Sequence, residues 1–167
     1  GRTHIEVFEE ASLYGINLKK FNSNIDWIDC SKLSEGKKVY HCDLSKISDL
    51  STLLYNLINK NKKMNGVIEI ISPLIFNNSI KIIYNFLFDL KKRIKKNKSI
   101  IMVLIEFGMH PQTEITALED LADLVIDLKL IGEKFNYQKY CHVKKSFGPL
   151  KKDNIKYEVT EKGIVIL

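Results

Sequence analysis

Hydrophobic residues along the chain form two kinds of pattern, short apolar runs and longer stretches with helical periodicity. The apolar runs at residues 67–71 and 100–105 predict strands that are buried on both faces of a parallel sheet. Residues 50–60 and 79–96 carry apolar side chains about every 3.6 positions and therefore predict amphipathic helices. Strands that alternate with helices in this way indicate an α/β sheet flanked by helices.

Shorter segments extend the pattern toward both ends of the chain. Short helices are predicted at residues 13–21, with a break at Gly15, and at residues 117–124, capped by Thr116. Asn65-Gly66 predicts a turn, and the remaining predicted strands are 4–8, 26–29, 39–42, 125–130, 137–144, 156–160 and 164–167. Because the last strands follow one another and enclose a turn at residues 161–163, we expect an antiparallel hairpin extension at the C-terminal end.

The composition fits one globular α/β domain spanning residues 1–167. Hydrophobic residues make up 45% of the chain, which excludes a disordered protein, and the length allows a substantial core. The apolar runs are far shorter than the ~20 residues that span a bilayer, so no membrane segment is predicted. The chain shows no secretory signal, and its three cysteines, Cys30, Cys42 and Cys141, are widely spaced; both features favour a reducing, cytoplasmic setting.

The net charge of +6 comes almost entirely from lysine, since Arg2 and Arg93 are the only arginines among 26 basic residues. Arginine binds phosphate groups through a planar fork that lysine lacks, so this excess is weak support for nucleic-acid binding. The densest basic run comprises Lys91, Lys92, Arg93, Lys95, Lys96 and Lys98. It lies at a predicted helix C-terminus, where cations interact favourably with the helix dipole, and it is either a solvated helix end or a contact for RNA or an acidic partner.

Common motifs for phosphate binding and nucleophilic catalysis do not occur in these 167 residues. No Gly-x-x-x-x-Gly-Lys-Ser/Thr loop is present, and Gly36-Lys37-Lys38 lacks both the first glycine and the hydroxyl that would hold magnesium. His41-Cys42 and Cys141-His142 contain potential metal ligands. Neighbouring residues in a strand point to opposite faces, so each pair would supply one ligand, in no known spacing. We therefore predict no metal centre.

Acidic residues occur at two unusual places. Glu69 interrupts the apolar run 67–71, where a buried carboxylate would cost several kcal/mol unless it were paired or held a cation. It is either an acid that orients a metal or water at the carboxyl end of a central strand, or a partly solvated glutamate. Glu9-Glu10 is likewise either a functional pair or the first turn of a helix.

Four segments follow one another in a distinctive order: Val7-Phe8-Glu9-Glu10, residues 67–74, residues 121–128 and residues 157–164. This series resembles the core of the RecA superfamily, specifically the KaiC-like ATPases. That family has a strand ending in Phe-Glu-Glu, a Walker B strand, an Ala-Asp-Gly-Val-Ile strand and a closing hairpin. The resemblance covers most of the chain and implies a RecA-like, mostly parallel sheet flanked by helices, with the N-terminal phosphate-loop portion lying outside residues 1–167.

The resemblance also implies roles for individual residues. Glu9 and Glu10 match the family's catalytic acids, which activate the attacking water, and Glu69 matches the Walker B acid that orients magnesium. Glu106 matches a polar residue of the sensing strand. Lys144 matches the lysine of a Lys-x-Arg element that reaches the γ-phosphate bound by a neighbouring subunit.

Three departures from the family pattern decide the functional prediction. The Walker A segment is missing from these residues, Glu69 stands where the family has aspartate, and Ser146 stands where it has the arginine of Lys-x-Arg. We therefore expect no bound cofactor, and ATP with magnesium only if the Walker A segment is supplied. The prediction is a non-catalytic assembly or regulatory subunit that forms homo- or hetero-oligomers with RecA-like subunits, and the transfer-RNA-contacting Elongator accessory ring resembles a precedent. The alternatives are the C-terminal portion of a KaiC-like ATPase and an α/β domain that binds a small molecule.

Overall fold

The computed structural model describes residues 2–61, 63–133, 136–148 and 154–167, which form two compact units. The first unit comprises residues 26–121 together with the N-terminal residues up to Thr3. The second unit comprises residues 4–25 and 122–167. Among the residues described, no helix has the length and apolar character needed to cross a membrane.

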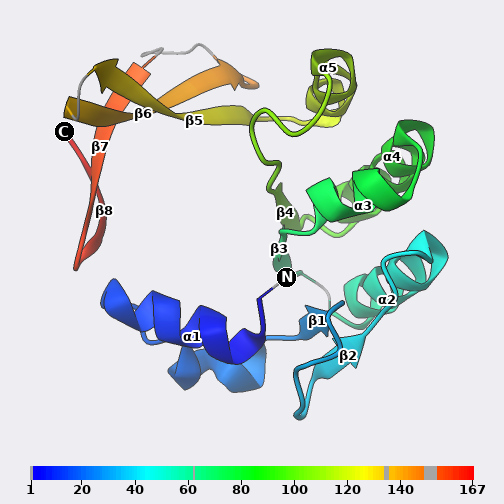
Figure 1. Ribbon diagram of the computed structural model, residues 1–167. Coiled ribbons are helices and arrows are strands. Elements are labelled where there is room, and N and C mark those ends of the chain that lie inside the picture. The colour runs from blue at the N-terminus through cyan, green and yellow to red at the C-terminus, as the bar shows by residue number, and fades with distance from the viewer. Residues whose placement is uncertain (1, 62, 134–135, 149–153) are drawn as a thin grey trace. The chain divides into compact units, whose positions relative to one another are not determined.

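Two pairs of parallel strands lie in the first unit (Figure 1). Strand β1 (Trp27–Asp29) pairs with β2 (Val39–His41), with Asp29 opposite His41. Strand β3 (Asn65–Ile68) pairs with β4 (Ile100–Val103), with Ile68 opposite Val103. Parallel neighbours need a crossover connection, which α3 (Ile71–Asn77) and α4 (Ile80–Lys96) provide between β3 and β4.

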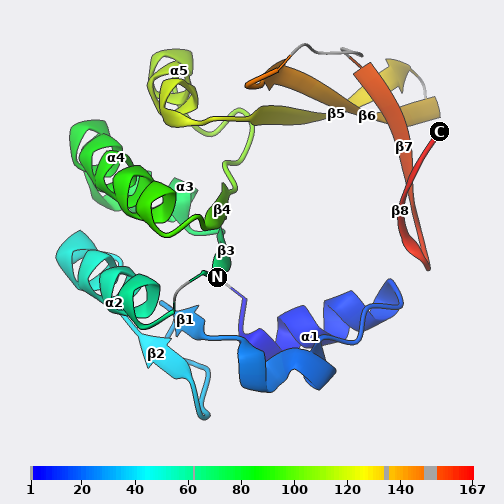
Figure 2. The same cartoon turned by 180° about the vertical axis from the view of Figure 1, so that it is seen from behind.

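Helix α2 (Ile47–Lys60) and α4 lie side by side on the same side of these strands in both views (Figures 1 and 2). Their buried side chains recur every three or four residues, as an amphipathic helix requires. The core cluster of the unit includes Leu50, Leu54, Ile58, Ile68, Ile71, Leu74, Ile83, Phe86 and Leu90, with Leu118 from α5 (Gln112–Leu121). Lys91 extends this packing, since its Nζ donates a hydrogen bond to the carbonyl of Leu121 at the end of α5.

The second unit combines α1 (His4–Leu13) and the 3₁₀ helix η1 (Leu18–Asn24) with a four-stranded antiparallel sheet. The strand order is β5-β6-β7-β8, with β5 at Val125–Glu133, β6 at Asn136–Lys145, β7 at Asn154–Thr160 and β8 at Gly163–Ile166. Gly163 has a φ of 94°, which glycine adopts without strain, and the tight β7–β8 connection depends on it.

The predicted α/β class and its antiparallel C-terminal extension are confirmed, as are the predicted helix at 79–96 and the terminal hairpin. Several local predictions are wrong. In place of the helix predicted at 13–21, α1 ends at Leu13 and the 3₁₀ helix η1 covers Leu18–Asn24. Residues 4–8 begin a helix rather than a strand, Asn65-Gly66 opens β3 rather than a turn, and α5 begins at Gln112 rather than at residue 117. Helix α5 starts early because Pro111, whose fixed φ suits a helix start, lies just before it, and its carbonyl accepts bonds from the amides of Glu114 and Ile115.

Within the first unit, the two apolar strands are covered on one face only, whereas the apolar runs predicted burial on both. Ile68, Ile101 and Val103 belong to or pack against the core cluster. Val67, Ile100 and Met102, which alternate with them, are exposed. The apolar runs therefore identified the strands. They did not show how many faces of each strand are covered by the described residues of the first unit.

Candidate functional site

The carboxyl ends of β3 and β4 bring two predicted site residues to one edge of the sheet. Glu69 directly follows β3, and Glu106 lies three residues beyond the end of β4. The strands continue to pair here, because the amide of Leu104 donates to the carbonyl of Ile68 over 2.9 Å. The buried Ser72, in the first turn of α3, accepts a hydrogen bond from the amide of Glu106 over 3.2 Å. In open α/β sheets this edge is where ligands bind.

Glu69 is held at this edge by Arg2. The guanidinium donates from Nε to Oε1 over 3.0 Å and from Nη2 to Oε2 over 2.9 Å, so the planar fork meets both carboxylate oxygens. Both side chains are 43% exposed, which places the pair at the surface rather than in the core. Of the two interpretations of Glu69, the structure agrees with a partly solvated residue, and it adds a cationic partner 67 positions away in sequence.

Magnesium favours carboxylate and water oxygens in an open octahedral arrangement. Both oxygens of Glu69 accept a hydrogen bond from Arg2, so a magnesium ion at this position would share the carboxylate with a guanidinium, and the magnesium-orienting role stays a prediction. Within the described residues, no three or more histidine, cysteine, aspartate or glutamate side chains are grouped as metal ligands.

Glu9 and Glu10 lie on α1, in the second unit, whereas Glu69 belongs to the first. Both are exposed, and the hydroxyl of Ser12 donates to the carbonyl of Glu9 over 2.6 Å within the same helix. The strand that the resemblance implied for these residues is therefore wrong. Their catalytic role stays a prediction.

Lys144 lies on β6, beside Asp127 of the neighbouring strand β5. Its Nζ is 3.9 Å from Oδ2 of Asp127, which also lies 3.6 Å from Nζ of Lys129. Ser146, at the position of the family's arginine, follows β6 and donates from its hydroxyl to the carbonyl of Gly148 over 2.8 Å. Lys144 thus has an acidic neighbour within its own sheet, and its contact with another subunit stays a prediction.

The basic run does not form one continuous surface, because its side chains leave α4 in different directions. Lys91 contacts the end of α5, as described above. Lys92 lies 3.4 Å from Asp89 and 4.1 Å from the ring centre of Phe88. The guanidinium of Arg93 stacks over the ring of Tyr55 on α2, at 4.1 Å. The cations therefore support packing between helices as well as the charge of the helix end.

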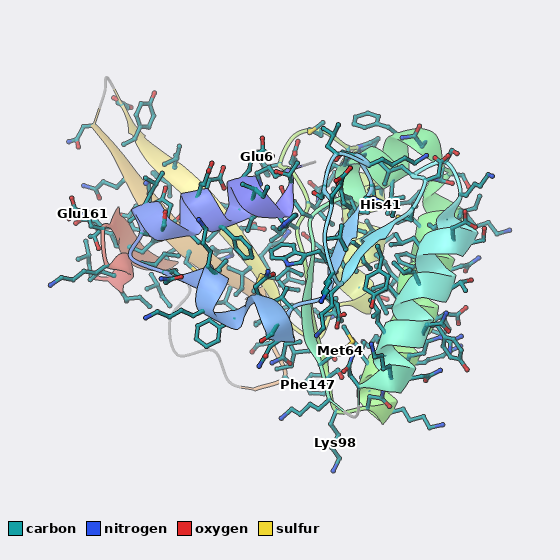
Figure 3. The ribbon with its side chains drawn as sticks, turned by 90° about the horizontal axis from the view of Figure 1, so that it is seen from below. Glu6, His41, Met64, Lys98, Phe147 and Glu161 are labelled. Carbon is teal, nitrogen blue, oxygen red and sulfur yellow. The ribbon has the colours of Figure 1, made fainter. Side chains whose placement is uncertain are left out.

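The far end of the run remains open to solvent. Lys95, Lys96 and Lys98 lie in the last turn of α4 and just beyond it, and Lys98 projects away from the ribbon in Figure 3. Hydrogen bonds with Asn59 and Arg93, and the charges of Arg93 and Lys96, lower the pKa of Tyr55. The positive charge of these side chains suits an anionic partner. A nucleic-acid contact stays a prediction.

The proposed cysteine and histidine ligands are not gathered. Cys30 and Cys42 lie together at the carboxyl ends of β1 and β2, whereas Cys141 and His142 lie on β6 in the second unit. His41 is exposed at the end of β2 and is labelled in Figure 3.

Sequence reasoning missed a buried carboxylate beside these cysteines. Asp29 ends β1 with only 7% of its surface exposed, and it accepts hydrogen bonds from the amide and hydroxyl of Ser31 and from the amides of Leu33 and Ser34. Burial alone would raise the pKa of Asp29, but these hydrogen bonds outweigh it and hold the pKa well below its usual range. The Asp-x-Ser spacing directly after a predicted strand was the available signal.

Comparisons with known proteins agree with this geometry. The family profile described as "ATPase: KaiC" matches residues 2–167. Among solved structures, the chain is similar to the KaiC-like protein PH0186 from the hyperthermophilic archaeon Pyrococcus horikoshii OT3, with a TM-score of 0.66 and 14% sequence identity, over 99% of this chain and 71% of that one. A search of curated proteins finds no match. The structural similarity supports a RecA-like fold with a C-terminal antiparallel sheet.

Proposed function

The chain belongs to the KaiC ATPase family, and from that premise we propose that it acts as a non-catalytic member, an assembly or regulatory subunit that associates with RecA-like subunits. The observation that carries the proposal is the bidentate ion pair between Arg2 and Glu69. An acid that orients magnesium acts through its negative charge, and here an arginine of the same chain offsets that charge.

The C-terminal sheet gives a second line of support. A lysine that stabilises phosphate in a neighbouring subunit must extend away from its own sheet, whereas Lys144 has Asp127 beside it. Ser146 provides no positive charge where the family has arginine. The groups that neutralise transition-state charge in phosphoryl transfer are therefore weak on this side as well.

Strand β5 supports the association part of the proposal. Ile126, Leu128 and Leu130 alternate along one face of this edge strand, and Leu128 and Leu130 are each 66% exposed. Adjacent exposed apolar side chains on an edge strand are typical of a surface that another protein covers. We propose that a RecA-like subunit packs on this face.

Phosphate release with magnesium and ATP tests the non-catalytic part. We expect the wild-type chain to release phosphate no faster than the Glu69→Gln variant, and the Arg2→Ala variant to stay at the same level. Arg93→Ala is the matched control for Arg2→Ala, because it removes the same charge at the other arginine. A wild-type rate that falls in Glu69→Gln would show that Glu69 is catalytic and overturn the proposal.

Light scattering after gel filtration tests the association part. We expect the wild-type chain to run as an oligomer, and the Leu128→Gln/Leu130→Gln double variant to shift toward monomer. Lys129→Gln, on the opposite face of the same strand, should leave the mass unchanged. A wild-type monomer at every concentration, alone and mixed with RecA-like partners, contradicts this part.

One observation favours an alternative function, the C-terminal portion of an active ATPase. Glu69 and Glu106 both lie at the sheet edge where ligands bind. If this alternative holds, supplying the family's Walker A segment in the same polypeptide restores phosphate release, and Glu69→Gln abolishes it. Continued inactivity of that longer chain supports the non-catalytic proposal instead.

A further inference from the structure

Cys30 and Cys42 lie side by side at the carboxyl ends of two paired strands. Asp29 of β1 is opposite His41 of β2, so the next residues along each strand, the two cysteines, follow in the same register. Neighbouring strands are about 4.8 Å apart, and disulfides join Cα atoms separated by about 4.4–6.8 Å. The usual spacing of paired strands therefore lies within the range of Cα separations that a disulfide joins.

The side chains already face each other. The two Sγ atoms are 3.0 Å apart, about 1 Å longer than the ~2.05 Å of a disulfide bond, and both thiols are free. Cys42 is 5% exposed and belongs to the core cluster, while Cys30 packs against that cluster and is partly exposed. A small rotation of the side chains brings the sulfurs to bonding distance.

We propose that Cys30 and Cys42 form a site of reversible thiol–disulfide exchange that takes a low-molecular-weight disulfide as its oxidant. The inference stands apart from the proposed function, because neither cysteine has a role in that proposal. Its product links β1 to β2 directly beside the turn that Asp29 organises.

The exchange balances in two steps. The Cys30 thiolate attacks one sulfur of the oxidant, forming a mixed disulfide and expelling one small thiolate. The Cys42 thiolate then attacks Sγ of Cys30 and expels the second small thiolate. In total the two protein thiols lose two electrons and two protons, and the oxidant is reduced to two thiols.

Cys30 is the entry point, because Cys42 is buried. Burial raises the pKa of the Cys30 thiol, and the neighbouring Cys42 and the charge of Asp29 raise it further. The thiolate is therefore scarce near neutral pH. The rate of the first step should increase about tenfold for each pH unit while the pH stays below that raised pKa.

Cys141 provides an internal reference, because it lies in the second unit, on β6. The full chain is incubated with oxidised and reduced glutathione at pH 7.5 and 8.5, then denatured, and its free thiols are counted. We expect one free thiol instead of three, a mass lower by two hydrogens, and a peptide map that links residue 30 to residue 42. Dithiothreitol should restore three thiols.

Two variants keep the result interpretable. Cys141→Ser should form the same link and leave no free thiol, while Cys30→Ser should form no internal link. Oxidation closes a loop of about 13 residues, so we expect it to raise the melting temperature of Cys141→Ser by about 6–12 °C. Three free thiols after prolonged incubation, stable glutathione adducts without the link, or products confined to Cys141 would each overturn the proposal.

Discussion

Asp29 and Asp43 provide a matched pair for testing how much one buried carboxylate stabilises the first unit. Asp29 ends β1 and Asp43 lies two residues beyond β2, and each lies two residues before a serine that donates from its amide and its hydroxyl. Asp29 also accepts hydrogen bonds from the amides of Leu33 and Ser34. It is buried, whereas Asp43 is more accessible to solvent. Replacing either residue with asparagine keeps the shape and removes the charge.

The asparagine in Asp29→Asn would keep one acceptor oxygen and place an NH₂ group where the other carboxylate oxygen stood. Oδ2 of Asp29 accepts from the amides of Leu33 and Ser34, at 3.1 and 2.7 Å, and Oδ1 accepts from Ser31. Whichever way the amide turns, two donors lose their acceptor. Each unsatisfied buried group costs about 1–3 kcal/mol, so two of them should lower the free energy of unfolding by about 2–6 kcal/mol.

Urea unfolding followed by the fluorescence of Trp27 measures this loss, because Trp27 is the only tryptophan and lies two residues before Asp29. Asp43→Asn, with fewer donors to leave unpaired, should lose less. A change in the urea midpoint without a change in slope would show that stability, rather than compactness, has changed.

The pH dependence gives an independent check. The folded pKa of Asp29 lies below its ordinary value of 3.8, so its stabilisation is present above that value and is lost as the pH falls through the folded pKa. The difference in stability between wild type and Asp29→Asn should therefore be largest near pH 6 and shrink below pH 4. Equal losses in the Asp29 and Asp43 variants, or a difference that does not change with pH, would refute the reasoning.

Three further changes test packing and backbone geometry. Ile83 is 0% exposed in the core, so Ile83→Ala leaves a cavity there. We expect it to lower the free energy of unfolding by about 2–5 kcal/mol in the Trp27 urea assay. Lys91→Met keeps the side-chain length but removes the bond to the carbonyl of Leu121; it should cost about 1 kcal/mol and increase amide hydrogen exchange at the end of α5. Gly15→Ala should lower the melting temperature measured by circular dichroism, because φ is 71° and a new Cβ would lie 3.0 Å from the carbonyl oxygen of Glu161.

The long elements could be predicted from the sequence because each contains several repeats of its own period. The helix predicted at 79–96 holds five turns of apolar spacing, and the structure places α4 at Ile80–Lys96. The five residues from 4 to 8 hold too few repeats to separate a period of 2 from one of 3.6. Gly15 was interpreted as a break within a helix at 13–21, whereas it marks the end of α1, where the amide of Ile16 donates to the carbonyl of Ala11.

Burial was predicted less well than element type. An apolar run shows that a strand avoids water on average, but it carries no information about which neighbour covers each face. Val67 and Met102 are exposed for this reason, although Ile68 and Val103 are covered as expected. The same limit applies to β5, where alternation identified the strand but could not show that Leu128 would be exposed.

Glu69 shows why a site residue can be found from sequence while its role cannot. The acid interrupts an apolar run, and that is visible locally, but its partner Arg2 lies 67 positions away and no spacing rule connects them. A carboxylate at this sheet edge can hold a cation for catalysis or bind a guanidinium, and the two arrangements use the same oxygens. A magnesium ion bound by Glu69 would share the carboxylate with Arg2, whose positive charge repels a second cation. The role of the acid therefore depends on the charge of a partner that no local pattern reveals, and for that reason it stays a prediction.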